Sequence, residues 1–328
     1  MRPDVCILGQ GLAGTLLAWE LERAGIPFVM VDAGHASASS RVAAGIINPI
    51  TGRRLVKSWR IDALRPLAEA TYRALEAELG VSVWRAMRVR RLFRDERERR
   101  IFREKQARGE LAPFAGDSDD SGFWIGGAAR VDTGVLLTAA RARWRAKGWL
   151  REERAEVATA LAAHGLVIDC TGATGARGGG VPWKFSKGEI LTLATDGLDP
   201  EVIVNSGHWL LPVGPGEAKV GATHEPGATD ATPTAAARAL LEASARELGA
   251  KDFRVTAHEA GVRVNLPDKH PVAGRWPGDP RHGVINGLGA KGALLAPLLA
   301  RQWLNHLTEG VAFDAAIDVA RFAPVGRI

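Results

Sequence analysis

Three glycines and one acidic residue near the start of the chain have the spacing of a dinucleotide-binding site. The turn Gly9-Gln10-Gly11-Leu12-Ala13-Gly14 has the pattern G-x-G-x-x-G, and Asp32 follows at roughly the 20-residue distance at which such sites bind a ribose. Gly9 suits a tight turn, Gly11 leaves room for a pyrophosphate, and Gly14 allows close packing. Because a 2′-phosphate would prevent ribose hydroxyls from donating to Asp32, we expect FAD or NAD rather than NADP.

The elements around this turn form a βαβ pattern. Val5 to Leu8 are predicted to form a buried strand, a helix follows the glycines until Gly25, and Phe28 to Val31 form the next strand. The free N–H groups at the helix N-terminus would bind the phosphates. Glycine is abundant, at 38 of 328 residues, so about 0.5 chance matches to the bare pattern are expected. The flanking elements therefore make the motif specific.

A long segment from Ala36 to Arg60 follows, and a loop of this length is typical of a functional site. It contains Ser40, Arg41, Ala43, Ala44, Gly45 and Ile46. Small residues at 43–45 would let the backbone approach a flat ring closely, although a plain surface loop is the alternative. Arg53 and Arg54 would add positive charge near such a site, or they are ordinary surface arginines.

The rest of the chain alternates predicted helices and strands. Apolar spacing predicts helices over Ile61–Leu79 and from about Thr133 to Gly148, a strand within Val81–Phe93, a charged helix up to Gly109, and a loop over Gly116–Gly127. A buried strand from Leu166 ends in a Thr171-Gly172 turn that would pass the cofactor. Three further strands, Lys187–Leu193, Trp209–Val213 and Ala218–Thr223, with a helix over Thr234–Leu248, indicate an antiparallel sheet.

A second G-x-G-x-x-G turn, Gly287 to Gly292, follows a predicted strand over Val284–Asn286. Too few residues remain after it for another nucleotide-binding domain, and Pro297 interrupts the helical pattern early. We therefore interpret it as a helix N-terminus that stabilises negative charge on a bound ring rather than as a second dinucleotide site.

Composition favours a globular protein of the cytoplasm. The formal charge is +6, but the 43 basic and 37 acidic residues are closely mixed, which is typical of solvated helix faces and does not favour nucleic-acid binding. Cys6 and Cys170 fall in apolar strands, which suits a reducing compartment. No apolar run has the length of a membrane span, and the eight histidines show no metal-ligand spacing, so we expect no metal.

Taken in order, these motifs resemble the FAD-dependent D-amino-acid-oxidase-like family, which includes glycine and sarcosine oxidases. The resemblance rests on the first glycine turn with Asp32, the Ser39–Gly45 loop, the Thr171-Gly172 turn, the pattern Gly261-x-Arg263…Asp268-x-x-Pro271-x-x-Gly274, and Gly287–Gly292 with Pro297. It implies an α/β fold with a Rossmann-type, glutathione-reductase-like FAD-binding domain of residues 1–80, 128–182 and 258–328. An antiparallel-sheet substrate domain (α+β) of residues 81–127 and 183–257 would be inserted into it.

The resemblance also implies roles for single residues. FAD would contact Gly9, Gly11, Leu12, Ala13, Gly14, Asp32, Ser40, Arg41, Ala43, Ala44, Gly45, Ile46, Thr171, Gly172, Gly289, Ala290, Lys291 and Gly292. Arg263 would bind a substrate carboxylate, and hydride would pass from the carbon bearing the amine to flavin N5. Backbone N–H groups near Gly292 would favour the anionic reduced flavin, with Lys291 and Arg53 adding charge. The alternative is that Lys291 is a solvent-facing lysine at a helix start.

The chain departs from the family at its aromatic residues. Members often place tyrosines beside the carboxylate-binding arginine, whereas Tyr72 is the one tyrosine here and lies in a predicted helix. His208 and Trp209 stand where the family often has an aromatic residue, so either could shape the pocket. The leading prediction is oxidation of a small amine or amino acid, with oxygen or a carrier as electron acceptor. The alternatives are a flavoenzyme acting on a modified tRNA base and a non-catalytic FAD-holding assembly or interaction protein.

Overall fold

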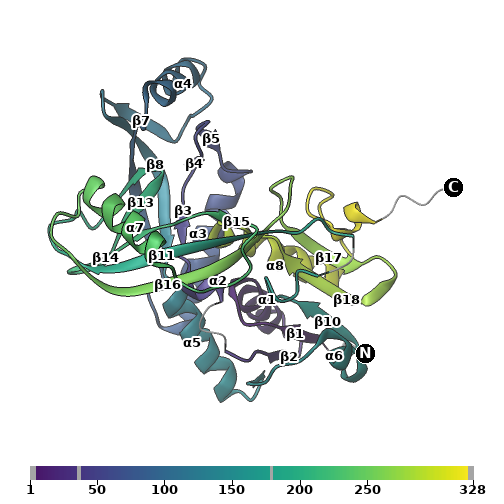
Figure 1. The fold of residues 1–328 in the computed structure, drawn as a ribbon. Helices are drawn as coiled ribbons and strands as arrows, with labels where there is room; N and C mark the ends of the chain where they lie inside the picture. Colours follow the sequence, from purple (N-terminus) through teal and green to yellow (C-terminus); the bar gives the residue numbers. More distant parts are fainter. Residues whose placement is uncertain (1–4, 35–37, 178–179, 324–328) are drawn as a thin grey trace.

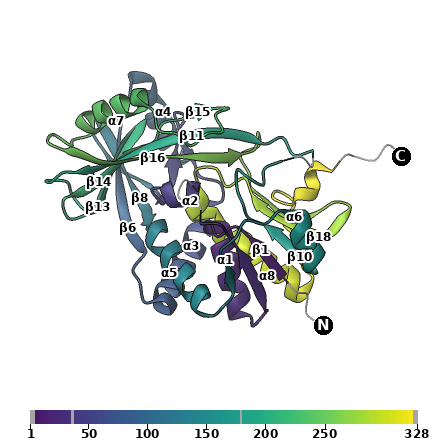
Figure 2. The same ribbon diagram turned by 60° about the horizontal axis from the view of Figure 1, so that its bottom comes forward.

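Two large β-sheets organise the molecule. The computed structural model describes residues 5–34, 38–177 and 180–323, and within them one sheet has six strands and the other ten. Figure 1 shows the smaller sheet beside α1 and the larger sheet crossing the other half of the molecule, with α4 at its far end. In Figure 2, α7 lies on the side of the large sheet away from α1, α3 and α5.

The six-stranded sheet contains the predicted βαβ unit. Its central strand β1 (Val5–Leu8) pairs in parallel with β2 (Phe28–Val31) and with β10 (Leu166–Asp169), and all residues of β1 and β10 are buried. Such two-sided burial explains their continuous apolar sequences. The order is β17-β18-β10-β1-β2-β9, completed by β9 (Leu150–Arg151), β17 (Val272–Trp276) and β18 (Asp279–Asn286), of which β17 is antiparallel to β18.

Helices pack against this sheet and against one another. Helix α1 (Leu12–Arg23) contacts α8 (Gly292–Glu309), which also contacts α3 (Ile61–Leu79). The remaining helices are α2 (Ser39–Val42), α4 (Glu96–Ala107), α5 (Thr133–Ala146), α6 (Val157–Ala163), α7 (Ala235–Glu247) and the 3₁₀ helix η1 (Val319–Phe322). No helix in the described part of the chain is long and apolar enough to cross a bilayer.

The ten-stranded sheet is mixed rather than purely antiparallel, because β12 pairs in parallel with β6. Its strands are β3 (Ile46–Ile47), β6 (Trp84–Leu92), β7 (Ala115–Ser118), β8 (Gly122–Val131), β11 (Lys184–Ala194), β12 (Val202–Ser206), β13 (His208–Gly214), β14 (Glu217–Gly221), β15 (Glu225–Pro226) and β16 (Arg254–Asn265). A separate hairpin joins β4 (Ile50–Thr51) to β5 (Val56–Lys57).

Most predicted elements are confirmed, and three are corrected. The helix over Ile61–Leu79 has the predicted bounds, whereas the loop predicted over Gly116–Gly127 contains most of β7 and the first half of β8. Its glycines and acids hid a strand that is held by pairing with β6. The long loop from Ala36 is broken by α2 and three short strands, and residues 36 and 37 lie outside the described part. Pro297 lies inside α8 and does not end it.

The predicted domain boundaries cross two strands of the large sheet. The boundary at residue 128 falls within β8, and the boundary at residue 258 falls within β16. Each strand therefore begins in the predicted substrate domain and ends in the predicted FAD-binding domain. The division into these segments stays a prediction.

Glu22 links α1 to α5, and this contact generates a pH-dependent prediction. Its carboxylate accepts hydrogen bonds from Arg143 at 2.7 Å, from Trp144 at 2.9 Å and from Lys147. Burial alone would raise the pKa of Glu22, but these hydrogen bonds outweigh it and lower the pKa from 4.5 to about 2. The contact therefore stabilises the fold above pH 4.5 and is lost as the pH falls towards 2.

We expect Glu22→Gln to lower the free energy of unfolding at neutral pH by about 1–3 kcal/mol, because charged hydrogen bonds are lost. Urea denaturation over a pH series should show that the difference from wild type shrinks below pH 4.5. Glu104→Gln, an exposed change on α4, is the matched control and should have little effect. A difference that is independent of pH would contradict this account.

Candidate active site

The first turn of α1 forms one wall of the site. Gly11 is the N-cap residue, and the backbone N–H of Leu12 donates to Ser40 Oγ at 3.0 Å. A Cβ on Gly11 would lie 3.3 Å from the same Oγ, so α2 approaches this turn closely. Beyond Leu12, the N–H groups of the first turn have no acceptor within the helix, and a side chain at residue 11 would extend into the space beside them, which is the form of an anion cradle.

Gly9 and Gly14 shape this turn without lining the cavity. A Cβ on Gly14 would lie 2.0 Å from the carbonyl oxygen of Gly9, and one on Gly9, where φ is +92°, would lie 2.8 Å from that of Cys170. These contacts are backbone approaches that only glycine permits. The two residues therefore bring α1 against the ends of β1 and β10.

Asp32 stands at the end of β2, as predicted, and an arginine not foreseen from the sequence binds it. Its carboxylate accepts from the backbone N–H of Gln10 at 2.8 Å and of Gly34 at 2.7 Å, and from Arg141 of α5 at 2.8 Å. Burial alone would raise the pKa of Asp32, but these hydrogen bonds outweigh it and lower the pKa. The carboxylate is held ionised and keeps capacity for a further donor such as a ribose hydroxyl.

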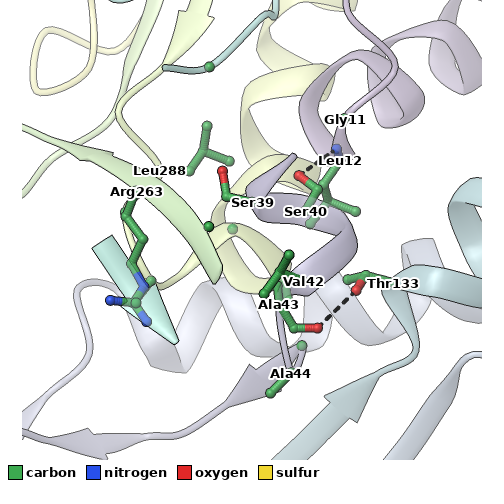
Figure 3. Close-up of a pocket in the computed structure, with 18 of the residues that line it drawn as sticks. Gly11, Leu12, Ser39, Ser40, Val42, Ala43, Ala44, Thr133, Arg263 and Leu288 are labelled. Atoms are coloured by element: carbon green, nitrogen blue, oxygen red, sulfur yellow. Dashed lines mark hydrogen bonds between the residues drawn. The ribbon is translucent and has the colours of Figure 1, made fainter. Parts of the chain in front are cut away.

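The inner cavity lies between α1, α2, β16 and the start of α8. Among the predicted cofactor and substrate residues it is lined by Gly11, Leu12, Ala13, Ser40, Ala43, Ala44, Gly45, Ile46, Gly172, Trp209, Arg263, Gly289, Ala290 and Gly292. Figure 3 shows Arg263 and Leu288 on one side of this cavity and the Ser39–Ala44 segment on the other. Thr133 Oγ1 donates to the carbonyl of Ala43 at 3.2 Å, which anchors that segment to α5 (Figure 3).

Arg263 extends from β16 across its neighbour β11. Its Nη1 donates to the carbonyl of Thr223 at 3.2 Å, and a Cβ on Gly188 of β11 would lie 2.0 Å from its Nη2. Gly188 therefore provides the space that the guanidinium occupies. No carboxylate among the described residues lies within ion-pair distance, and burial lowers the pKa of Arg263. A half-buried cation without a counter-charge has a strong tendency to bind an anion.

Gly261 explains the Gly-x-Arg spacing. Residues 261 and 263 share one face of β16, and a Cβ on Gly261 would lie 3.2 Å from Ser39 Cα. The glycine lets α2 approach the strand, and two residues later the arginine lines the same cavity as α2. The pattern thus brings a cation to the loop that borders the cavity.

The second glycine turn is fixed to β16 and to α3. The N–H of Gly289 donates to the carbonyl of Val264 at 2.9 Å, and a Cβ at this glycine would lie 2.2 Å from Asn265 Oδ1. The buried Tyr72 hydroxyl donates to the carbonyl of Ala293 in the first turn of α8 at 2.9 Å. The one tyrosine of the chain therefore supports the helix N-terminus that lines the cavity and does not contact substrate space directly.

The remaining predicted residues lie elsewhere. Gly9, Gly14, Asp32, Arg41, Thr171, His208, Lys291 and Arg53 do not line the inner cavity. The Thr171 hydroxyl donates to Asp169 at 2.6 Å, and the His208 ring bonds Ser244 of α7 at 2.7 Å. The structure therefore brings Trp209 and Arg263 together and does not bring His208 to them. The binding roles of all these residues stay predictions.

A middle cavity of about 320 Å³ adjoins the inner one and carries positive charge. Ile46, Trp209 and Ala290 line both cavities, while Arg53, Arg91, Arg94 and Lys291 line the middle one. Arg91 is paired with the buried Glu98, and burial lowers the pKa of Lys291. Arg53 and Lys291 thus line the cavity that adjoins the inner one, and their roles stay predictions.

Several lining residues were not foreseen from sequence. Gly188, Ile190 and Ala222 line the inner cavity from the large sheet, and Thr133 and Leu288 line it from α5 and the second glycine turn. A glycine inside the predicted strand Lys187–Leu193 was the available signal, because glycine within a strand often marks a close approach. No group of three or more His, Cys, Asp or Glu that could hold a metal occurs among the residues the structure describes.

These features fit a dinucleotide with a flat ring. The Gly11 cradle and the first turn of α1 suit a pyrophosphate, Asp32 suits a ribose, and the small residues Ala43, Ala44 and Gly45 line the cavity as a ring would require. The first turn of α8 lines the same cavity through Gly292 and Ala293. FAD combines all three groups in one molecule.

Comparison with known proteins agrees with this fit. A family model described as FAD dependent oxidoreductase matches residues 4–304. The chain is 27% identical over 370 residues to a glycine oxidase from Pseudomonas aeruginosa, covering all of both proteins. It is 33% identical over 346 residues to a tRNA 5-methylaminomethyl-2-thiouridine biosynthesis bifunctional protein from Maricaulis maris, with 98% of this chain aligned. The chain spans only 54% of that bifunctional relative.

Two solved structures show the same fold. A glycine oxidase from Geobacillus kaustophilus has a TM-score of 0.78 at 22% identity, with 98% of each chain covered. An iminodiacetate oxidase from Chelativorans sp. BNC1 has a TM-score of 0.77 at 21% identity, covering 98% of this chain and 99% of that one. Both share the parallel sheet and the curled mixed sheet described above.

The Gly11 cradle generates a prediction about cofactor content. We expect Gly11→Val to purify as a folded protein with at least about tenfold less FAD, because the branched side chain would meet Ser40 and keep the pyrophosphate from the helix. Absorbance of the released flavin per mole of protein measures this. Gly214→Ala is the control, since a Cβ there meets nothing within 4 Å and should leave FAD content unchanged. Full FAD content in Gly11→Val would overturn the assignment of this cradle.

Proposed function

The chain belongs to the FAD-dependent oxidoreductase family and uses FAD as its cofactor, and on this premise we propose that it oxidises the C–N bond of an amine, specifically an amino acid. The observation that carries the proposal is the half-buried guanidinium of Arg263, which faces the inner cavity without a carboxylate partner among the described residues. An amino acid would supply that carboxylate and place its amine-bearing carbon deeper in the cavity.

Arg263 would bind and orient the substrate. A planar guanidinium makes two parallel hydrogen bonds to a carboxylate, which fixes direction as well as position. Thr223 holds one edge of the guanidinium through its carbonyl. Because orientation of the reacting carbon supplies much of the catalysis in such transfers, this clamp would act mainly through geometry.

FAD, which the Gly11 cradle and Asp32 would hold, would supply the redox chemistry as the acceptor of a hydride from the carbon that bears the amine. The amine nitrogen would release a proton to solvent as the C=N bond forms, and water would hydrolyse the resulting imine to a carbonyl compound and ammonia or an amine. Trp209 and Ile190 line the cavity with apolar surface and would limit water near the reacting carbon. The first turn of α8, from Gly292, presents backbone N–H groups that would stabilise developing negative charge.

A second candidate is an amine carried on a modified tRNA base. The relative from Maricaulis maris, which is named for tRNA thiouridine biosynthesis, supports it, although the chain spans 54% of that protein. Cationic residues around the middle cavity also favour a large anionic substrate. Absence of flavin reduction by free amino acids, together with tight RNA binding, would favour this candidate. A third reading, a non-catalytic FAD-holding protein, requires that no amine reduce the flavin at all.

An anaerobic assay tests the leading proposal. We expect one of glycine, sarcosine, L-proline, iminodiacetate or a D-amino acid to bleach the visible flavin band of the purified protein. Repeating the reaction in air separates an oxidase from a dehydrogenase, because only an oxidase regains its colour rapidly by reducing oxygen. A flavoprotein that no amine bleaches would contradict the proposal.

We expect Arg263→Ala to lower the affinity for the amino acid that bleaches the wild-type flavin by about a hundredfold or more, while FAD content is retained. Removing one partner of a buried ion pair costs about 2–5 kcal/mol, and each 1.4 kcal/mol is about tenfold. Arg254→Ala on the same strand is the matched control, since Arg254 is exposed and lines none of the cavities described here. Unchanged reduction kinetics in Arg263→Ala would refute the carboxylate clamp.

A further inference from the structure

A third cavity lies beyond the middle one and has no role in the proposed oxidation. This outer cavity has a volume of about 550 Å³, which is within the size range of small-molecule sites. Its lining comes from the β4–β5 hairpin, the turn that contains Lys269, and the start of α8. Five basic side chains face it, namely Arg53, Arg54, Lys57, Lys269 and Lys291, and no carboxylate lines it.

Most of these cations are not neutralised by the protein. Lys57 pairs with Asp62 at 2.8 Å. For the other four, the described residues offer no carboxylate within ion-pair distance. Like charges that converge on one cavity repel one another, and an anion in the cavity would relieve that repulsion. Arg53, Arg54 and Lys269 are exposed, and the lining carries charge of one sign rather than mixed charge, which favours an anionic ligand at this open cavity.

The backbone around this cavity is strained. Within the described residues, the non-glycine residues with positive φ are Leu55 at 47°, Arg60 at 48° and Lys269 at 65°. Leu55 lies in the β4–β5 hairpin, Arg60 follows the lining residue Trp59, and Lys269 lines the cavity. Conformations of this kind cost free energy and cluster at functional sites. At Lys269 the strained conformation brings a lysine to the cavity where a glycine would be the relaxed choice.

The outer cavity adjoins the middle cavity, which in turn adjoins the inner one. Thr51, Gly52, Arg53 and Lys291 line both the outer and the middle cavities. The middle cavity in turn shares Trp209 and Ile46 with the inner one. A ligand could therefore extend from the inner cavity, past Trp209, to the cations of the hairpin.

We propose that the outer cavity binds a phosphate group of the substrate, so that the amine oxidised in the inner cavity belongs to a phosphate-bearing molecule. This inference rests on the proposed function for the reacting end of the ligand. An arginine guanidinium can donate two parallel hydrogen bonds to two oxygens of a phosphate, and a lysine ammonium adds a compact positive charge. The phosphate can belong to a small phosphomonoester or to the phosphodiester backbone of RNA, and the experiment below distinguishes these sources.

Binding is measured by calorimetry on the FAD-loaded protein with two probes, O-phosphoethanolamine and a short single-stranded oligoribonucleotide. We expect the wild-type protein to bind at least one of these probes. Arg54→Ala should lower the affinity for that probe about tenfold, because one charged hydrogen bond is lost. For the RNA probe the slope of log affinity against log salt should fall in magnitude by about 0.7. Arg54→Lys should recover part of the affinity.

Lys269→Gly separates loss of charge from loss of folding. Glycine relaxes the positive φ at this position, so the melting temperature should stay the same or rise while phosphate affinity falls about tenfold. Arg238→Ala on α7, which removes an exposed arginine far from the lining residues, should leave affinity unchanged. Failure of both probes to bind, or equal affinity in wild type, Arg54→Ala and Lys269→Gly, would overturn the proposal.

The outcome is independent of the amine-oxidation test. Arg263→Ala should lose amine-dependent bleaching and keep phosphate binding, because Arg263 does not line the outer cavity. If phosphate binds through Arg54 and Lys269 but no amine bleaches the flavin, the site stands and the proposed function fails. If free amino acids bleach the flavin and no phosphate probe binds, the outer site alone fails.

Discussion

The structure depends on the short segment α2, which is held between the two sheets. Ser40 Oγ accepts from the first turn of α1, Gly261 lets α2 contact β16, and the chain then enters the large sheet at Gly45. A Cβ on Gly45 would lie 1.8 Å from the carbonyl of Val131, so this passage requires backbone against backbone. The segment from Ser39 to Ile46 thus contacts α1, β16 and β8 in turn, and it forms one wall of the inner cavity.

The two charged residues Asp32 and Arg263 differ in how many partners the protein gives them. Asp32 accepts hydrogen bonds from Gln10, Gly34 and Arg141, so the fold holds it as an anion that keeps capacity for a further donor. Arg263 has only a carbonyl partner, and burial lowers its pKa. A group satisfied within the protein serves structure and orientation, whereas an unsatisfied one retains free energy for a ligand. Asp32 is thus fixed beside the first glycine turn, outside the inner cavity, whereas Arg263 lines that cavity and has no carboxylate partner among the described residues.

The three cavities lie in a row that follows increasing positive charge. Apolar surface and small residues surround the inner one, Arg53 and Lys291 border the middle one, and the outer one is lined by five basic side chains. The cofactor supplies the redox chemistry, and the β4–β5 hairpin with the Lys269 turn places positive charge at the outer cavity. Substrate choice on such a fold is decided by the elements at the mouth of the cavity, because the chemistry belongs to the cofactor.

The sequence by itself determined the βαβ unit, with its glycines and Asp32, since this unit rests on spacing within a few dozen residues. The α/β class and the FAD-dependent family followed from an ordered set of motifs along nearly the whole chain. Sequence also indicated Arg263 and the Ser39–Gly45 loop through resemblance. Only the tertiary structure decided that Arg141 binds Asp32, that Gly188 makes room for Arg263, and that Arg54 and Lys269 converge on one cavity. Those contacts join positions that are far apart in the chain, and strand pairing and packing rather than local periodicity bring them together.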